Sequence, residues 1–254
     1  MDFLTFAGAI VAVAAIALGF SLEGGQLSVL FQLEAFLIVV GGTLGAVMIQ
    51  NTWTRFIDGM KQLRWAFSTP KPVDRKDLTQ LLEWGRKAKM EGLIGLESIN
   101  TKGVNGFAAR GIQLLANGVP SVVIDDALSR ELEAYERNQM AAAKIWSQAG
   151  GYSPTFGIIG AVLGLIQVTS HIAEPTELGK GIAVAFVATL YGVGFANLVY
   201  LPVYGKIKAQ IDSEILYRKM YLDGIMAISR KESPKTIEAR LIGDIRQKAD
   251  EVLA

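Results

Sequence analysis

The chain contains 254 residues, of which 51% are apolar and only 19% are charged, and its formal net charge is +1. A charge so close to neutral gives no reason to expect nucleic-acid binding. The absence of cysteine excludes disulfides, thiol catalysis and cysteine-based metal sites. The single histidine, His171, is too few for a histidine-rich metal site. The apolar share exceeds that of an ordinary soluble domain, so the composition favours a membrane protein.

Two apolar stretches near the N-terminus predict a first pair of membrane spans. They are FLTFAGAIVAVAAIALGFSL (3–22) and LEAFLIVVGGTLGAVMIQ (33–50), with Glu34 at the entrance of the second. A span needs about 20 mostly apolar residues. No Lys or Arg precedes the first run and no clear cleavage motif ends it, so we interpret it as a retained span rather than a secretory signal. Residues 1–50 are therefore predicted to form transmembrane helices 1 and 2.

Residues 51–149 are predicted to form a helical cytoplasmic domain, because apolar positions recur there at helical spacing between turn residues. The first expected element is a helix over 55–68, stopped by TPKP (69–72), and the second is a helix with Asp74 as its N-cap. Gly92 and Gly95 are expected to break the segment that follows. A helix over 105–118 should end on Gly118, and a long helix capped by Ser121 could then run into the third span.

Two further apolar stretches, 150–172 and 181–203, contain no Asp, Glu, Lys or Arg and are joined by a short loop. Residues 150–203 are therefore predicted to hold transmembrane helices 3 and 4. Small residues recur in both at helical spacing: Ser153, Gly157, Gly160 and Gly164 in the third span, and Ala185, Ala188, Gly192 and Ala196 in the fourth. Such residues allow helices to approach closely in lipid. Ordinary helix packing accounts for them without any further function.

The C-terminal residues 204–254 are predicted to be cytoplasmic helices. Residues 204–232 are strongly amphipathic and are expected to continue the fourth span out of the membrane. A final helix follows, with Ser233 as its cap and Pro234 in its first turn. No strand pattern and no internal repeat stands out. The fold class expected from these elements is an all-α membrane protein with four transmembrane helices and a large helical cytoplasmic domain.

The distribution of basic residues predicts the orientation in the membrane. Of the 25 Lys and Arg residues, 14 lie in residues 51–149 and 10 in residues 204–254; the exception is Lys180. The two short loops carry Glu23, Glu174 and Glu177 instead. Since Lys and Arg near spans stay on the cytoplasmic side, both short loops are expected outside and both termini in the cytoplasm.

Polar side chains inside spans usually face protein or a water-filled path. The third span carries Ser153, and the fourth carries Thr189 and Asn197. Thr189 falls on the same helix face as Ala185 and Gly192, so it is expected to face a close-packed neighbour. A proton relay normally needs a titratable group, and no carboxylate lies inside these spans. If ions cross here, a second protein must therefore supply the carboxylate; the alternative is that no ion crosses.

Two prolines lie in or beside the last two spans, Pro154 and Pro202. Each removes a helix hydrogen bond and marks a bend. A simple kink at a span boundary explains them equally well. His171 near the outer end of the third span could titrate, but an interfacial position is the favoured interpretation.

The ordered set of motifs closely resembles the A subunit of bacterial flagellar stators, the MotA/PomA family. The residues that carry the resemblance are FLIVVGGTLGAVM (36–48), KMEGLIGLE (89–97), SPTFGIIGAVLGLI (153–166), ATLYGVGFANLVYLPV (188–203) and MYLDGIMAI (220–228). It extends over nearly the whole chain, with order and spacing kept.

The resemblance implies an ion-conducting subunit of the bacterial inner membrane that helps to turn the flagellar rotor. It implies a ring of five such subunits around two copies of a MotB/PomB-type B subunit, each with one span that carries an essential Asp and a domain that binds peptidoglycan. It also implies contact with the rotor switch protein FliG. Neither a cofactor nor nucleic acid is expected.

Specific residues take their expected roles from the same resemblance. Pro154 and Pro202 match the prolines of the third and fourth spans, and Thr189 matches the threonine that faces the ion-carrying Asp. Lys89 replaces a basic residue, usually Arg, at the rotor contact, and Glu97 matches its acidic partner. Lys keeps the charge but lacks the planar fork of Arg. From spacing alone, Lys89 and Glu97 would be a solvated helix face.

The coupling ion is expected to be the proton. Sodium-driven members of the family resemble this chain but carry Thr at the positions of Ala161 and Ala188. Sodium needs oxygen ligands to replace its lost water, and two methyl groups supply none. Together with Thr189, Pro154, Pro202 and Asn197, these two alanines complete the set of residues expected along the ion path.

Other functions were compared with the motor subunit. A proton-driven ExbB/TolQ-type energiser of outer-membrane processes resembles the last two spans, but such proteins have three spans and an outside N-terminus. The sequence shows no nucleophile–base set, phosphate loop or metal cluster, so an enzyme is not expected. A passive scaffold is a further alternative, and it would tolerate substitution of Thr189 and Pro154.

Overall fold

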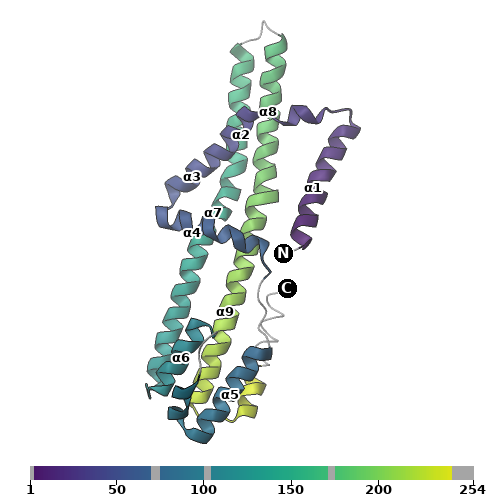
Figure 1. The fold of residues 1–254 in the computed structure, drawn as a ribbon. Coiled ribbons are helices and arrows are strands. Elements are labelled where there is room, and N and C mark those ends of the chain that lie inside the picture. Colours follow the sequence, from purple (N-terminus) through teal and green to yellow (C-terminus); the bar gives the residue numbers. More distant parts are fainter. Residues whose placement is uncertain (1–2, 70–74, 100–103, 171–174, 242–254) are drawn as a thin grey trace. The chain divides into compact units, whose positions relative to one another are not determined.

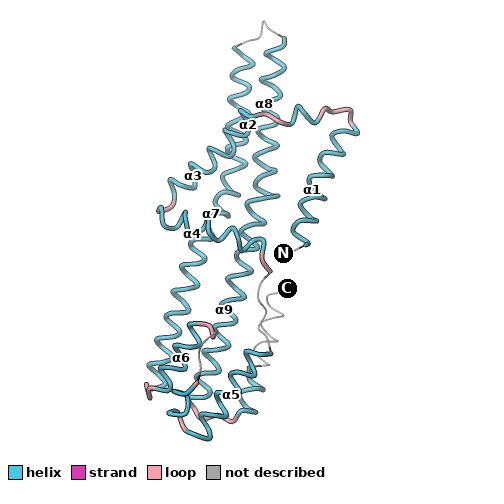
Figure 2. The backbone as a smooth tube through the Cα atoms, viewed as in Figure 1, coloured by secondary structure: helices cyan, strands magenta, loops and turns pink. Residues whose placement is uncertain are grey.

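The structure is a computed structural model, and it describes residues 3–69, 75–99, 104–170 and 175–241 (Figures 1 and 2). The described residues are helical almost throughout and include no strand. Four helical segments are long and apolar enough to cross a membrane: Thr5–Leu22, Leu27–Gln50, Ser121–Ser170 and Leu178–Ser229. The expected all-α fold with four membrane spans and a large helical region is therefore confirmed.

The first pair of spans follows the predicted bounds. Helix α1 covers Phe3–Leu22. A turn at Gly24, whose φ of +83° suits glycine, and a short 3-10 helix, η1 (Leu27–Leu30), lead to the second span. This span is one helical run made of α2 (Leu33–Phe36), a π turn, η2 (Leu37–Gly41), and α3 (Gly42–Gln50).

The second pair of spans belongs to much longer helices. Helix α7 runs over Ser121–Ser170, so the long helix does continue into the third span. The fourth span lies in one helical run made of α8 (Pro175–Phe195), a π turn, η5 (Ala196–Tyr200), and α9 (Leu201–Ser229), so its helix does continue into the residues after 203. The cap predicted at Ser121 is wrong by one residue: the carbonyl of Pro120 already accepts from the amide of Ile124 at 3.1 Å. The loop expected between residues 172 and 181 is partly helical, because α8 already begins at Pro175, a position where the fixed φ and missing N–H of proline are tolerated.

The remaining described elements are α4 (Trp53–Gln62), η3 (Leu63–Phe67), α5 (Arg75–Glu91), η4 (Leu93–Ser98), α6 (Gly106–Ala116) and a short helix from Pro234 to Leu241. The single helix expected over 55–68 is thus too long, because it ends at Gln62 and tightens into a 3-10 turn. The expected break at Gly92 is confirmed by its φ of +73°. The predicted cap Asp74 and most of the TPKP stop lie outside the described residues.

The chain divides into two compact units, Met1–Thr69 with Met140–Lys208 and Pro70–Gln139 with Ala209–Ala254. The first contains the membrane spans and α4. The second contains α5, α6 and the distal parts of α7 and α9.

Backbone-to-backbone contact joins α7 to α8 in the first unit. A Cβ placed on Gly157 would lie 3.1 Å from the Cα of Gly192, and one placed on Gly164 would lie 2.8 Å from the carbonyl oxygen of Gly181. A Cβ on Gly192 would lie 2.8 Å from the carbonyl oxygen of Ser153. The small residues predicted from spacing therefore do mediate a close helix pair.

The second span packs against this pair through the same kind of contact. Gly42 lies against the ring of Phe156, and a Cβ on Gly160 would lie 3.4 Å from Ile38. On the side of α8, a small core forms from Ala35, Val39, Val187 and Ala188. Three of the four spans thus share one apolar core in which glycine and alanine set the spacing.

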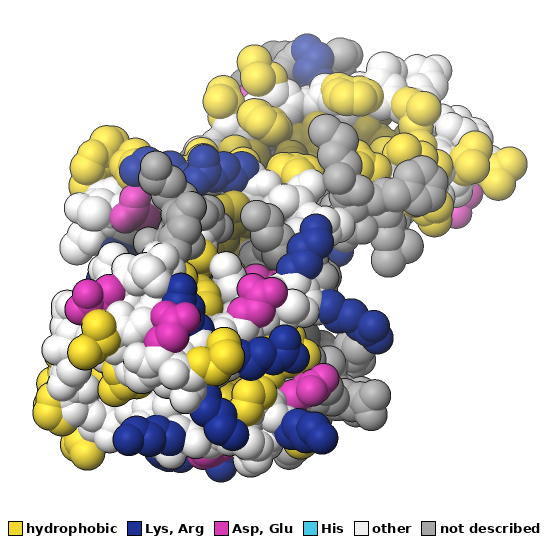
Figure 3. Space-filling model, turned by 60° about the horizontal axis from the view of Figure 1, so that its bottom comes forward, with side chains coloured by type: hydrophobic (Ala, Val, Ile, Leu, Met, Phe, Trp, Pro, Cys, Tyr) yellow, Lys and Arg dark blue, Asp and Glu magenta, His cyan; other side chains and the backbone are white. Residues whose placement is uncertain are grey.

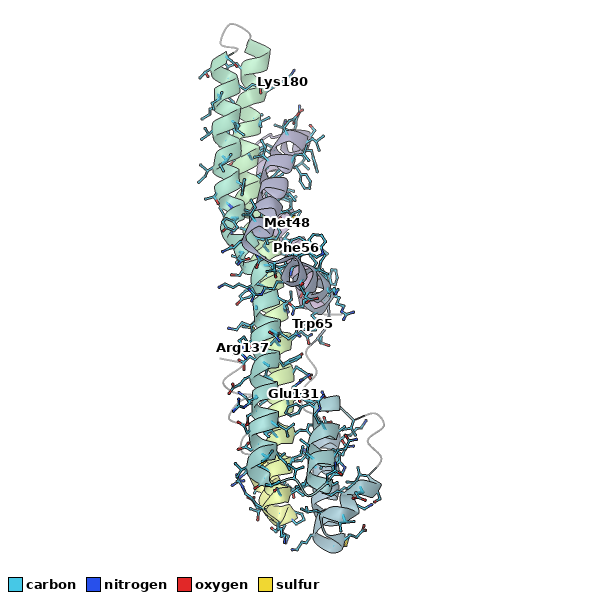
Figure 4. The ribbon with its side chains drawn as sticks, turned by 90° about the vertical axis from the view of Figure 1, so that its left-hand side faces the viewer. Met48, Phe56, Trp65, Glu131, Arg137 and Lys180 are labelled. Atoms are coloured by element: carbon cyan, nitrogen blue, oxygen red, sulfur yellow. The ribbon has the colours of Figure 1, made fainter. Side chains whose placement is uncertain are left out.

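Polar contacts fix α4 where the spans end. The indole Nε1 of Trp146 donates to the carbonyl of Gly59 at 2.9 Å in a buried contact. Asn51, in the turn before α4, donates to Oε1 of Gln148 at 2.6 Å. Figure 4 labels Met48 of α3 and Phe56 of α4 on either side of this turn. Helix α4 is therefore tied to α7 by its backbone as well as by apolar side chains.

In the second unit, a buried tyrosine joins α5 to α9. Tyr221 is fully buried, and its hydroxyl donates to Oδ1 of Asp77 at 3.0 Å. Burial raises the pKa of the Tyr221 phenol, so the group stays protonated and able to donate. Leu81 packs over Gly224 close to this bond.

Arg218 of α9 lies over the ring of Tyr135 of α7, 3.7 Å from its centroid.

Replacing Gly192 by Ala tests the close helix pair. The new methyl group would lie 2.9 Å from the Cα of Gly157, so we expect a loss of about 1–3 kcal/mol in stability from overpacking against backbone that cannot move aside. Gly194→Ala is the matched control, since a Cβ there meets nothing within 4 Å. Thermal unfolding of the detergent-purified protein measures both; equal melting temperatures for the two variants would contradict the close contact.

Candidate functional site

Thr189 lies on the exposed face of α8. Its hydroxyl donates to the carbonyl of Ala185, one turn earlier, at 3.2 Å. The preceding residue, Ala188, is fully buried, and one helix position turns a side chain by about 100°. The backbone of Thr189 therefore lies in the contact with α7, where its Cα is 3.4 Å from a Cβ placed on Gly157, and its side chain is exposed. The close-packed neighbour expected for it does not come from this chain's own described residues.

The exposed face around Thr189 is otherwise mainly apolar. Phe186 is 74% exposed and Val193 49% exposed, and both lie three or four residues from Thr189 on the helix. Asn197 extends the same face, and its side-chain amide donates to the carbonyl of Val193 at 2.9 Å. The side chains of Thr189 and Asn197 thus each donate a hydrogen bond to a carbonyl of their own helix. Their remaining hydrogen-bonding capacity is directed away from the chain's own described residues.

The two alanines that bear on the choice of ion occupy different environments. The methyl group of Ala188 lies against α7, where a Cβ on Gly160 would be 2.6 Å from it, and it belongs to the core with Ala35 and Val39. Ala161 on α7 is only partly buried. The structure therefore separates Ala188, inside the chain's own packing, from Thr189 on the exposed face.

Both prolines lie inside helical runs and not at their ends. Pro154 is partly buried in the middle of α7. Pro202 is the second residue of α9, directly after the π turn η5. A proline lacks the N–H that would reach the carbonyl four residues earlier, and a π turn before it is one way in which a helix accommodates this.

Titratable groups are scarce in this region. The last two spans contain no carboxylate by sequence, and Glu34 in the first turn of α2 is exposed. No group of acidic, histidine or cysteine side chains suited to a metal ion occurs among the described residues. Lys180, labelled in Figure 4 near the start of α8, is the one basic residue in the sequence between 145 and 205. A path for protons through these spans has no acid of its own.

Lys89 and Glu97 lie in the second unit, on either side of the turn at Gly92. Both side chains are exposed, Lys89 in the last turn of α5 and Glu97 in η4. The neighbouring Leu96 is 2% exposed and anchors η4. The near face in Figure 3 carries Lys and Arg interspersed with Asp and Glu. The arrangement presents two exposed, opposite charges on the two helical elements that flank Gly92.

Two hydrogen-bonding residues of this region were not identified as sites from sequence. The hydroxyl of Tyr191 donates to the carbonyl of Leu30 at 2.6 Å and accepts from the amide of Gln32 at 3.4 Å, which fixes the link between the first two spans against α8. The hydroxyl of Ser153 donates to the carbonyl of Gly192 at 2.9 Å. Neither bond follows from periodicity, because its partners are far apart in sequence.

Comparison with known proteins gives a consistent result over the whole chain. Residues 100–220 match the model of the MotA/TolQ/ExbB proton channel family, and residues 6–89 match that of the motility protein A N-terminal region. Motility protein A of Bacillus subtilis is 33% identical over 95% of this chain and 90% of its own length. Chemotaxis protein PomA of Vibrio alginolyticus is 28% identical over 95% of this chain and 94% of its own length.

Two solved structures share the fold. The structure of C. jejuni MotAB superposes with a TM-score of 0.90 at 28% identity, over 96% of both chains. The flagellar MotAB stator complex from Bacillus subtilis superposes with a TM-score of 0.85 at 32% identity, over 96% of this chain and 98% of that one.

The burial of Ala188 leads to a prediction about threonine at the two alanine positions. Ala188→Thr should destabilise the protein by about 1–3 kcal/mol, because the larger side chain must fit against Gly160. Ala161→Thr, at a partly buried position, should cost clearly less. Thermal melts of the two purified variants compare them, and an Ala188→Thr protein as stable as the Ala161→Thr protein would contradict this placement of Ala188.

Proposed function

Because this chain belongs to the motility protein A branch of the MotA/TolQ/ExbB proton channel family, we propose that it is the stator subunit that works with a B-type subunit to convert ion-motive force into flagellar torque. One observation of the site carries this proposal. The fourth span exposes Thr189 and Asn197 on an apolar face, and the last two spans contain no carboxylate. A proton path along this face needs an acid from another chain, which is the task of the B subunit's Asp.

The exposed face of the last two spans is the proposed binding surface for the transmembrane helix of the B subunit. Large apolar side chains such as Ile166 on α7 and Phe186 on α8 are more than half exposed in the single chain. In a membrane such a face meets lipid or protein, and the polar groups on it favour protein. The complexes named MotAB among the similar structures support a B-type partner. We assign five copies of this chain to a ring around two B subunits.

The proposed location is the bacterial inner membrane, with both termini in the cytoplasm. The argument is the distribution of charge: 24 of the 25 Lys and Arg residues fall in residues 51–149 and 204–254. Both of these segments, including the turn with Lys89 and Glu97, are then cytoplasmic.

The proposed rotor contact is the exposed turn that carries Lys89 and Glu97. These two exposed, opposite charges can pair with complementary charges on the rotor switch protein FliG. Exposed ion pairs contribute about 0–1 kcal/mol each. Such a contact therefore orients the two proteins and dissociates quickly instead of binding them tightly. That property suits a motor that engages the rotor repeatedly. The chain acts as a channel and motor component rather than as an enzyme.

The proton is the proposed coupling ion. Methyl groups at Ala161 and Ala188 provide no oxygen ligand for a sodium ion, and the matched family is described as a proton channel family. An ExbB/TolQ-type role is the second candidate, but the match of residues 6–89 to the motility protein A N-terminal region favours the motor.

Complementation tests the proposed function. The chain, expressed with its B subunit in a bacterium that lacks its own stator, should restore swimming. The same chain with a B subunit whose intramembrane Asp is replaced by Asn should not. Swimming with the Asn variant, or no swimming with the unaltered pair when both proteins reach the membrane, would refute the proposal.

Pro154→Leu should impair torque while leaving insertion and assembly largely intact. The substitution restores a backbone N–H inside α7 and so removes a flexible point, but it adds no charge to the span. Swimming speed and the amount of A–B complex recovered from membranes are measured together. Normal swimming by the variant would argue against a role for Pro154 in ion gating.

Glu97→Lys should weaken rotor engagement more than ion flow, because Glu97 is exposed in η4 and distant in sequence from the spans. Glu136→Lys is the control, since Glu136 is also an exposed acid of the second unit. Motor speed and proton conductance are recorded for both variants. An equal loss of speed and conductance in Glu97→Lys would assign Glu97 a structural role instead.

A further inference from the structure

Ser153 makes a hydrogen bond that connects the last two spans where their backbones are in direct contact. Its side chain is fully buried, and its hydroxyl donates to the carbonyl of Gly192 at 2.9 Å. The bond lies where the backbones of the two helices touch, since a Cβ on Gly192 would be 2.9 Å from the Cα of Gly157. By contrast, the exposed hydroxyl of Thr169, on the same helix, donates to the carbonyl of Ile166 within its own helix.

A side chain from beside Pro202 contacts α7 about one turn before Ser153. Pro154 follows Ser153 and withholds an N–H from the carbonyl of Gly150. Leu201, the residue before Pro202, packs its side chain over Gly150, 2.6 Å from where a Cβ would stand. The last two spans therefore also touch at the residue whose carbonyl Pro154 leaves without its helical donor.

The bond also adjoins the proposed ion path. Gly192 lies one turn after Thr189, so the carbonyl that Ser153 holds belongs to the same stretch of α8. Van der Waals packing between the glycine and alanine residues of the small-residue contact has little directionality. A directional bond across it fixes the register of the two helices, because it is made at only one relative height.

We propose that Ser153 is a positioning residue that holds α7 and α8 in register, so that a displacement of the helix carrying Thr189 moves α7 with it. The inference rests on the proposed function. Loss of the hydroxyl leaves the spans assembled, since a hydrogen bond between membrane helices contributes little to stability. It allows slip between them, so that ions pass with less torque delivered.

Torque per assembled stator is the measurement that tests this role. In Ser153→Ala, stator number per motor, counted by fluorescence, should match that of the unaltered protein. Torque per stator at high load should fall about threefold, the order of effect expected from one buried hydrogen bond. Ser153→Thr keeps the hydroxyl and should recover most of the torque. Thr169→Ala, which removes a hydroxyl bonded only within its helix, should behave as the unaltered protein.

Three results would overturn the inference. They are an unchanged torque per stator in Ser153→Ala, a loss explained entirely by fewer stators, and a Ser153→Thr variant that assembles normally yet delivers as little torque as Ser153→Ala. If Ser153→Ala does not assemble, Ser153→Cys, with a weaker donor of similar size, replaces it; failure of both to assemble makes the role structural. Absence of rotation with the unaltered chain would instead refute the proposed function.

Discussion

The direct contact between the backbones of α7 and α8 is the constraint on which the rest of the membrane unit depends. Where Gly157 meets Gly192, no side chain fits between the two helices. The contact uses the faces that carry the small residues, so larger side chains must occupy the remaining faces. The exposure of Thr189 and Asn197 is a consequence of this, and so is the burial of Ala188 one position away.

The same constraint explains why the site is incomplete in one chain. Hydrocarbon strongly disfavours an unpaired charge, and an acidic side chain on the tight face would have no room. The chain keeps its spans free of carboxylates and presents hydroxyl and amide groups that can accompany an acid from a partner. In the proposed complex, this chain would provide the close-packed helix pair and the B subunit would supply the titratable group.

Several features could be predicted from sequence because they depend on local composition. The bounds of α1 and of the second span follow from runs of apolar residues, and the break at Gly92 follows from residue type. The face of small residues was also identified, because helical spacing alone defines it. Lys89 and Glu97 were singled out only through the family's motifs, and their exposure is compatible with that assignment.

Other features could not be predicted, because they arise from contacts between distant residues. The bonds from Ser153 to Gly192 and from Tyr191 to Leu30 join positions 39 and 161 residues apart. Whether the side chain of Thr189 points toward α7 or away from it depends on the exact rotation of α8 about its axis. The helical periodicity of 3.6 residues does not determine that rotation to within one residue. The end of α4 at Gln62 likewise depends on its docking to Trp146, and not on its own sequence.

Proton flux into sealed vesicles tests the central claim, that the chain provides a path without an acid of its own. Vesicles that contain this chain alone should take up protons no faster than empty vesicles under the same gradient. Vesicles with the complex of this chain and its B subunit, in its active form, should take up protons, and the Asp→Asn form of the B subunit should abolish the uptake. Sustained proton uptake by the chain alone would contradict the account.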